Sequence, residues 1–306
     1  MRTLRKGVLL AAKWAWVACV AVAGAYLLAR SWDDIVHMLA KVSPGWMAGS
    51  ILLTVLAKAA LAENARIAAG RNGIVLPFAR AARLYNLSQL GKYLPGSIWQ
   101  FVGRAAAYRG HGADYGPIRD ALLVESLWVV GGAAAFGVLL AGPGVLTFVS
   151  ESLDTLVALW LVGGVVIVTL AAGVTFAMKR ELALRYARIA MPSVRVVLVQ
   201  ASIWGLLGAA FWVLARACNL DVPLLFAAGL FAVAYAVGFL VPFAPAGLGV
   251  RDAVLTLGLL PYVPAGEALV VTILARLIYL LVDVGLVLVQ EPLFTAFGTR
   301  DDASKA

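Results

Sequence analysis

Long apolar segments separated by shorter polar stretches dominate the pattern of hydrophobic and polar positions along the chain. A bilayer core of about 30 Å requires about 20 apolar residues in helical form. Seven segments meet this requirement: Val8–Ala29, Gly45–Ala62, Ile118–Leu140, Thr155–Met178, Val194–Ala215, Leu224–Val241 and Ala268–Val289. Because the hydrocarbon interior offers no hydrogen-bond partner, backbone groups must pair within each segment, and we predict that all seven are helices.

Two further segments are apolar but interrupted. Residues 84–104 are moderately apolar, and residues 241–261 contain a continuous apolar stretch only over Ala253–Leu260, which is short for a bilayer span. Proline and glycine break both segments: Pro95 and Gly96 break the first, and Pro242, Pro245, Gly247 and Gly249 break the second. In transporters, paired segments broken in this way point to a substrate site. The pattern leaves open whether the two segments belong to a structural repeat.

The composition is that of a protein embedded in a membrane. Of the 306 residues, 63% are hydrophobic and 13% are charged, compared with about 45–50% and about 25% in ordinary globular proteins. A soluble enzyme, a disordered chain and a secreted disulfide scaffold are therefore excluded. We predict an all-α polytopic membrane protein with seven to eight transmembrane helices and one or two re-entrant or broken segments (84–104 and 241–261). Residues 1–292 are expected to form a single integral-membrane domain, followed by a short polar tail at residues 293–306.

The uneven distribution of Lys and Arg orients the predicted helices. The chain has 25 Lys and Arg against 16 Asp and Glu, a net charge of +9. Basic residues gather at the N-terminus, between the second and third spans and after the fourth span, whereas residues 141–154 contain no Lys or Arg. Because basic loops remain in the cytoplasm, we expect an integral plasma (inner) membrane protein with a cytoplasmic N-terminus.

The same rule bears on the broken segments. If residues 84–104 crossed the membrane, two loops would violate the charge rule, so we predict that this segment re-enters the cytoplasmic face or lies at the interface. Charge does not decide whether residues 241–261 cross, and the side of the C-terminus stays open.

A few ionisable residues lie within or beside the apolar segments, where charge is unfavourable and usually functional. Arg276 lies near the middle of the last span, and Asp283 follows two turns later on the same helix face. Glu125 lies about two turns into the third span. Arg251 and Asp252 begin the short helix after the second break, where the free N–H groups of a first helical turn favour an anion.

Two interpretations of these residues stay open. In the structural one, the charges pair with one another, or with an Arg of a cytoplasmic loop in the case of Glu125, and Lys58 extends to the cytoplasmic surface. In the functional one, Arg side chains bind a lipid phosphate bidentately. The predicted phosphate-binding residues are Arg104, Arg251 and Arg276, and the predicted counter-ions or proton-coupling groups are Glu125, Asp252 and Asp283.

The residues expected of common membrane enzymes are absent from the sequence. The two histidines, His37 and His111, lie outside the predicted spans, which argues against a His-based lipid phosphatase and against a metalloprotease. The sequence contains no Walker motif, no G-x-S-x-G motif and no Cys/His metal constellation. We therefore expect no cofactor, no metal ion and no catalytic residue, although an Arg-rich membrane transferase stays an alternative.

Two motifs resemble those of a known family. They are KYLPGSIWQFVGRAAAYRGHG (Lys92–Gly112) and PFAPAGLGVRDAVL (Pro242–Leu255), and they are accompanied by Glu125 and Arg276. Together they resemble the flippase-like membrane domain of lysylphosphatidylglycerol synthases, in which Glu typically occupies the position of Asp252. The resemblance implies translocation or presentation of a lipid. Because no soluble synthase domain follows the membrane part, we expect aminoacyl transfer to be absent.

From these observations we predict non-enzymatic translocation of a phosphate-containing lipid or lipid-linked sugar between leaflets. The expected partners are membrane lipids, anionic or linked to polyprenyl phosphate, and a glycosyltransferase or other envelope-biosynthesis protein; no nucleic acid is expected. Two alternatives stay open. One is a membrane transferase acting on a lipid-linked phosphate, and the other is an accessory subunit that docks a glycosyltransferase through the surface between Arg66 and Arg119.

Overall fold

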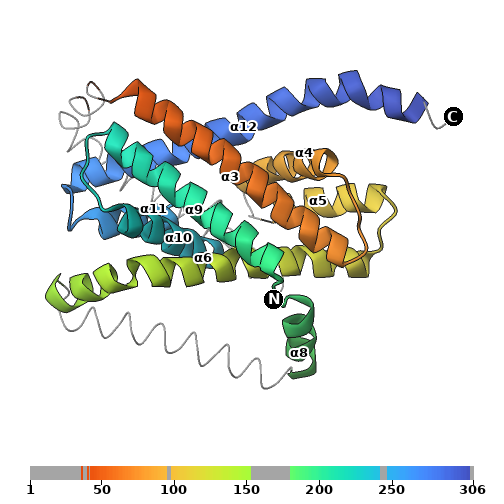
Figure 1. Ribbon diagram of the computed structural model, residues 1–306, viewed down its shortest axis with the longest axis horizontal. Coiled ribbons are helices and arrows are strands. Elements are labelled where there is room, and N and C mark those ends of the chain that lie inside the picture. The colour runs from red at the N-terminus through yellow and green to blue at the C-terminus, as the bar shows by residue number, and fades with distance from the viewer. Residues whose placement is uncertain are drawn as a thin grey trace, which may run out of the picture.

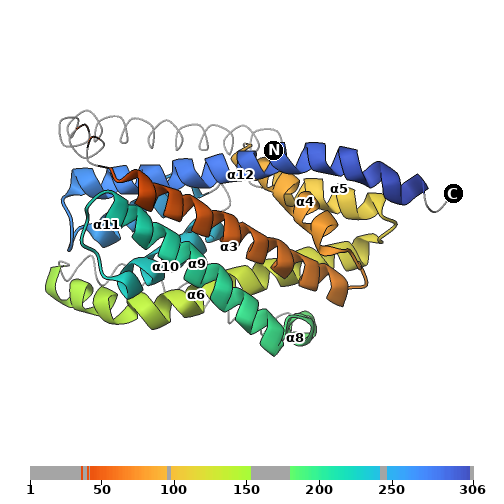
Figure 2. The same ribbon diagram turned by 45° about the horizontal axis from the view of Figure 1, so that its top comes forward.

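The computed structural model describes residues 42–94, 98–152, 180–241 and 247–303, together with Val36 and Ala40. In this part of the chain the regular elements are all helical (Figures 1 and 2). They are α3 (Pro44–Arg71), α4 (Phe78–Gln89), the 3-10 helix η1 (Leu90–Tyr93), α5 (Trp99–Gly110), α6 (Tyr115–Ser152), α8 (Arg180–Ile189), α9 (Val194–Ala217), α10 (Leu224–Leu240), α11 (Val250–Leu259) and α12 (Ala265–Ala303). The predicted spans Val8–Ala29 and Thr155–Met178 lie outside the described residues, as do Pro95, Gly96, Pro242 and Pro245.

Four helices are long and apolar enough to cross a membrane, and they confirm four of the predicted spans. These are α3, residues 115–142 of α6, α9, and residues 265–291 of α12. The polytopic all-α prediction is therefore confirmed. Helix α10 is a shorter apolar helix of 17 residues, about 25 Å long at 1.5 Å per residue. Helix α12 continues to Ala303, so the predicted polar tail is helical over residues 293–303.

Small residues allow the central helices to approach one another closely. A Cβ atom added at Gly208 of α9 would lie 2.4 Å from the Cβ of Ala228 in α10. At Gly137 of α6 it would lie 2.9 Å from the backbone nitrogen of Val233 in α10. Such contacts are typical of membrane helices, which gain no hydrophobic driving force from the surrounding lipid and depend on close packing.

Helices α4, η1 and α5 form a helical hairpin, called hairpin 1 here. Its two arms are 12 residues each and run antiparallel, because a Cβ at Gly91 would lie 2.7 Å from the backbone nitrogen of Gln100. The Arg104 guanidinium, halfway along α5, donates a hydrogen bond at 3.1 Å to the hydroxyl of Ser88 in the last turn of α4. The chain therefore returns to the end of the molecule from which it came, in agreement with the prediction that residues 84–104 do not cross.

Helices α10 and α11 form a second helical hairpin, called hairpin 2 here. Gly258 of α11 packs on Leu230 near the start of α10, whereas a Cβ at Gly238, near the end of α10, would lie 3.0 Å from the Cβ of Arg251. These contacts make the helices antiparallel. Helix α11 has only 10 residues, and α12 follows it along the chain. The chain thus runs in opposite directions in α10 and α11.

The two hairpins approach the middle of the molecule from opposite ends (Figures 1 and 2). Their tips meet beside α12, where the Phe101 and Phe239 rings are 6.5 Å apart. Hairpin 1 is held to the far part of α12 by Arg83, which forms an ion pair with Glu291 at 2.7 Å. Hairpin 2 is held to the first half of α12 by Asp252, which pairs with Arg276 at 3.2 Å.

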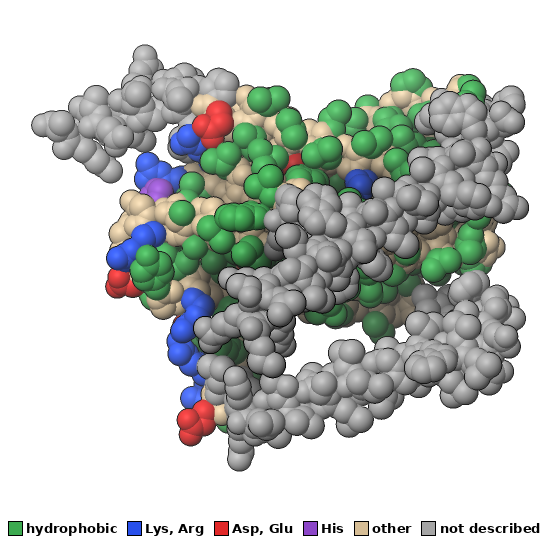
Figure 3. All heavy atoms as spheres, turned by 180° about the vertical axis from the view of Figure 1, so that it is seen from behind, with side chains coloured by type: hydrophobic (Ala, Val, Ile, Leu, Met, Phe, Trp, Pro, Cys, Tyr) green, Lys and Arg blue, Asp and Glu red, His purple; other side chains and the backbone are tan. Residues whose placement is uncertain are grey.

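Basic residues collect at the end of the molecule where hairpin 1 begins, in a surface that we call the basic collar (Figure 3). Several of them join neighbouring helices: Arg195 of α9 pairs with Glu63 of α3 at 2.5 Å, and Arg185 of α8 pairs with Asp120 of α6. The collar consists of Arg66, Arg71, Arg80, Arg83, Arg109, Arg119, Arg185, Arg188 and Arg195. Loops far apart in sequence thus share one end, as the cytoplasmic orientation predicts for basic loops.

Substitution Gly137→Ala tests the contact between α6 and α10. The added methyl group meets backbone atoms of Val233 and Gly229 at about 3 Å, and overpacking of this kind costs about 1–3 kcal/mol. We expect a lower midpoint of thermal unfolding in detergent. Gly131→Ala on the same helix is the control, because its methyl group meets nothing within 4 Å. Equal midpoints for the two variants would contradict the packing.

Candidate functional site

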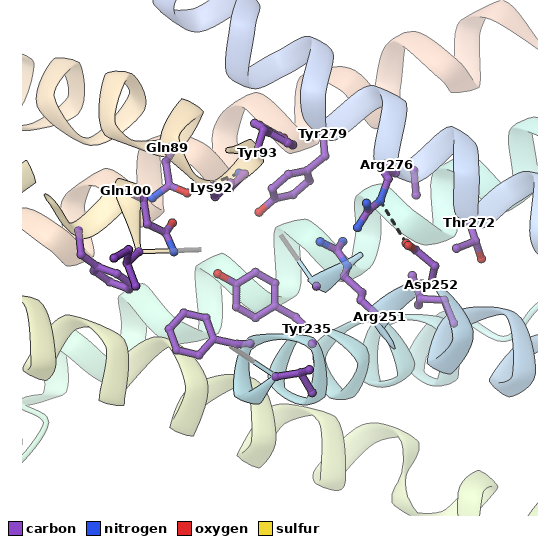
Figure 4. Close-up of a pocket in the computed structure, with 18 of the residues that line it drawn as sticks. Gln89, Lys92, Tyr93, Gln100, Tyr235, Arg251, Asp252, Thr272, Arg276 and Tyr279 are labelled. Atoms are coloured by element: carbon purple, nitrogen blue, oxygen red, sulfur yellow. Dashed lines mark hydrogen bonds and ion pairs between the residues drawn. The ribbon is translucent and has the colours of Figure 1, made fainter. Parts of the chain in front are cut away.

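A cavity of about 250 Å³ lies where the tips of the two hairpins meet α12 (Figure 4). Both broken segments and the last span contribute to its wall, as the paired breaks predict. The labelled polar residues of the wall are Gln89, Lys92, Tyr93 and Gln100 from hairpin 1, Tyr235, Arg251 and Asp252 from hairpin 2, and Thr272, Arg276 and Tyr279 from α12. The cavity thus gathers polar side chains inside an apolar bundle, and apolar residues such as Ile98, Phe101 and Leu255 complete its wall.

Arg251 is held in the cavity by aromatic rings. Its guanidinium carbon lies 4.5 Å from the centre of the Phe231 ring, 5.2 Å from that of Tyr279 and 5.8 Å from that of Tyr235. Glycine makes room for it, since Gly238 and Gly247 lie next to its Cβ. Aromatic faces stabilise a cation without neutralising it, so the positive charge of Arg251 remains available to an anion.

Asp252 has two partners, one on its own helix and one on α12. Its Oδ2 accepts a hydrogen bond from the backbone N–H of Gly249 at 3.0 Å, and its Oδ1 accepts one from Nε of Arg276 at 3.2 Å. Gly249 has φ +84°, in the left-handed region where glycine is favoured. The start of α11, predicted as an anion site through its free N–H groups, is therefore capped in part by Asp252 itself. The side chains of Arg251 and Arg276 point into the same space (Figure 4).

Asp283 is the centre of a buried charge cluster next to the cavity. Its exposed fraction is 0%, and it forms ion pairs at 2.5 Å with Lys58 of α3 and with Lys92 of η1. The Tyr93 hydroxyl donates a further hydrogen bond to it at 2.7 Å. Burial, together with the neighbouring Lys58 ammonium, lowers the pKa of Lys92 to about 8. The structural interpretation, in which the charges pair with one another, allowed a pair between Asp283 and Arg276. The two residues have separate partners instead, because Arg276 pairs with Asp252.

Lys58 was expected to extend to the cytoplasmic surface, and this expectation is wrong. The side chain is 1% exposed and its ammonium lies 3.6 Å from the centre of the Tyr279 ring. Because a carboxylate and an aromatic face lie within reach on α12, the ammonium is stabilised inside the bundle and need not extend to water.

Arg104 and Glu125 lie outside the wall of the cavity. Arg104 is 1% exposed, and its guanidinium forms hydrogen bonds with both carboxylate oxygens of Glu125. It also lies 4.6 Å above the Tyr85 ring. The pair joins α5 to α6. Glu125 therefore has the structural role of an ion-pair partner, as one of the two interpretations predicts. Of the three predicted phosphate-binding residues, the structure brings together Arg251 and Arg276.

The charges around the cavity do not balance among the described residues. Two carboxylates, Asp252 and Asp283, face four cations: Lys58, Lys92, Arg251 and Arg276. Both carboxylates are bound to cations other than Arg251. The site thus carries an excess of two positive charges in an apolar surrounding, and such an excess favours the binding of an anion.

Lys92 and the tyrosines were not identified from the sequence as site residues. Lys92 begins the first motif and carries a charge next to a proline break, a signal that could have identified it. Tyr235 and Tyr279 carry no such signal, because tyrosine within a span is common in membrane helices. No group of His, Cys, Asp and Glu suited to a metal ion occurs among the described residues.

One family model matches most of the chain. It is described as the lysylphosphatidylglycerol synthase TM region, and it matches residues 13–286. The match includes both hairpins, α12 up to Leu286 and every polar residue that lines the cavity. A search of curated proteins finds no match.

Substitution Asp283→Asn tests whether the buried cluster holds α3, hairpin 1 and α12 together. Removing the carboxylate leaves two buried ammonium groups without their counter-ion, which we expect to destabilise the fold by about 3–5 kcal/mol. Thermal unfolding in detergent measures the change, and adding Lys58→Met should recover part of the loss.

Asp221→Asn is the matched control, because Asp221 forms an ion pair with Arg216 while its side chain is 97% exposed. We expect this control to change the free energy of unfolding by less than about 0.5 kcal/mol. A similar small effect for Asp283→Asn would contradict the role of the cluster.

Proposed function

This chain belongs to the lysylphosphatidylglycerol synthase TM family, and we propose that it moves a phosphate-containing lipid between leaflets without changing it chemically. The observation that carries the proposal is the excess of positive charge in the cavity between the two hairpins. Arg251 supplies the central charge, since aromatic rings position it while the described carboxylates bind other cations. A lipid phosphate would balance this charge.

The residues around Arg251 suit a phosphate group. A guanidinium presents donors in a planar fork that matches two oxygens of a phosphate, and it remains charged at any physiological pH. Arg276 points into the same space from α12, and Lys92 reaches it from hairpin 1 (Figure 4). A phosphate placed there would meet cations from all three parts of the wall.

The apolar part of a lipid also finds a suitable surface. Ile98 lines the cavity and is 58% exposed, so this apolar side chain borders both the cavity and the outside of the described structure. Acyl or polyprenyl chains can remain in the bilayer along this surface while the phosphate occupies the cavity.

The proposed mechanism uses the hairpins as the movable walls of the cavity. Because hairpins 1 and 2 approach from opposite ends, a shift of one tip opens the cavity toward one end, and a shift of the other opens it toward the opposite end. In this proposal the protein lies in the plasma membrane and the base of hairpin 1 faces the cytoplasm, which the basic collar supports because basic loops remain on that side. In this proposal Asp252 positions the Arg276 side chain through their ion pair and takes part in no proton transfer.

Substitution Arg251→Ala tests the proposal directly. We expect it to reduce the translocation of a fluorescent phosphatidylglycerol in proteoliposomes at least about tenfold, because a charge-assisted contact to the phosphate is worth about 1.5–3 kcal/mol. Dithionite quenching of the dye in the outer leaflet measures the rate. Arg251→Lys, which keeps the charge but not the fork, should retain part of it.

Arg109→Ala is the control for the loss of an arginine. Arg109 is half-exposed in the basic collar and pairs with Asp114 at 3.1 Å, away from the cavity wall. We expect its translocation rate to equal that of the unsubstituted protein. Unchanged translocation by a folded Arg251→Ala protein would overturn the proposed role of the cavity.

A further inference from the structure

The distribution of charged and neutral groups along the cavity bears on which headgroup fits it. We propose that the site selects a lipid whose phosphate carries an uncharged, hydroxyl-bearing group, such as a polyol or a sugar, and discriminates against a headgroup that carries an ammonium group. This inference rests on the proposed function, because it concerns the lipid bound in the same cavity.

The first argument is the lack of a place for a second cation. Of the residues that line the cavity, Lys92, Arg251 and Arg276 are cationic, and Asp252 is the acidic one among the described residues. Asp252 is already bound by Arg276 and by the N–H of Gly249. Asp283, just behind the wall, is held by two lysines. An ammonium group on the lipid would thus meet like charges and displace an existing ion pair to find a carboxylate.

The residues that follow η1 and α10 along the chain add no carboxylate to this balance of charge. Residues 95–97 and 242–246, which lie outside the described residues, contain no Asp or Glu. Among the described residues of the two hairpins, Asp252 is therefore the one carboxylate that lines the cavity.

The second argument is the chemistry at the other end of the cavity. Figure 4 shows Gln89 and Gln100 at the end away from Arg251 and Arg276, with tyrosine side chains between the two groups. Glutamine amides both donate and accept hydrogen bonds, and so do tyrosine hydroxyls. These are the neutral partners that suit hydroxyl groups, and the aromatic faces suit the apolar face of a sugar or the carbon chain of a polyol.

The two ends together define an orientation for the lipid. The phosphate lies between Arg251 and Arg276, and the group attached to it extends toward Gln89 and Gln100. Lys92 lies along this path and donates a hydrogen bond to Gln89 at 3.4 Å, so a headgroup ammonium would come close to the Lys92 ammonium. A hydroxyl at the same place would accept a hydrogen bond from it instead.

Competition between matched lipids tests this selectivity. The full chain in detergent is incubated with equal amounts of phosphatidylglycerol and lysylphosphatidylglycerol of the same acyl composition, and bound lipid is quantified by native mass spectrometry. Phosphatidylinositol and phosphatidylethanolamine form a second pair. We expect the hydroxylated lipid of each pair to be bound about tenfold more, the order expected for one repulsive contact between like charges. Equal binding, or preference for the ammonium-bearing lipid, would overturn the inference.

Substitution Gln89→Glu adds a carboxylate at the headgroup end with almost no change in shape. It should narrow the preference for phosphatidylglycerol over lysylphosphatidylglycerol at least about threefold, because a new negative charge near the headgroup favours an ammonium. Gln290→Glu is the control, since Gln290 accepts a hydrogen bond from Asn86 at 3.1 Å and does not line the cavity. An unchanged preference in Gln89→Glu would contradict the placement of the headgroup.

Two arms separate failure of this inference from failure of the proposed function. If lipids are translocated but the members of each pair bind equally, the selectivity is wrong and the proposed function stands. If Arg251→Ala leaves translocation unchanged, the proposed function fails, and this inference fails with it. Glycerophosphoglycerol, the headgroup without acyl chains, is expected to compete only weakly; competition as strong as that of phosphatidylglycerol would show that the ligand is a soluble phosphate ester.

Discussion

The unfavourable burial of charge among apolar helices is the constraint on which this structure depends. Asp283 lies at 0% exposure, and its charge is balanced by ammonium groups from two other elements, Lys58 on α3 and Lys92 on η1. Since each of these groups is strongly destabilising without the others, the three elements hold one another in a defined arrangement. Arg104 and Glu125 do the same for α5 and α6.

These buried pairs also shape the cavity. Hairpin 1 is a broken element with short arms, and it extends only to the middle of the molecule, where Lys92 and Tyr93 bind Asp283. Hairpin 2 ends at the same level, where Asp252 binds Arg276. A helix that runs through a bundle without a break contributes side chains to its interior, but its ends lie outside the interior. Two broken helices that meet at their tips therefore produce a polar space in which Arg251 remains without an ion-pair partner among the described residues.

Much of the fold follows from simple patterns in the sequence. Four spans were located because a run of about 20 apolar residues has few structural alternatives. Loop charges predicted that residues 84–104 return to the side from which they came, and the antiparallel arms of hairpin 1 agree with this prediction. The same signals did not separate two arginines that have different surroundings in the structure. Arg104 and Arg251 both lie beside a break in an apolar segment, yet one binds Glu125 and the other lies among aromatic rings.

The sequence by itself determined that the chain is an all-α membrane protein, that proline and glycine interrupt two of its apolar segments, and that Arg276 and Asp283 lie within an apolar span, because each follows from the composition of a local segment. Only the tertiary structure decided the partner of each charge. Lys58 turns inward to Asp283, and Arg276 pairs with Asp252. A partner depends on which faces of distant helices meet, and close contacts at positions such as Gly137 and Gly238 set those faces. The sequence of a local segment does not reveal such contacts, because each contact joins residues that are far apart along the chain.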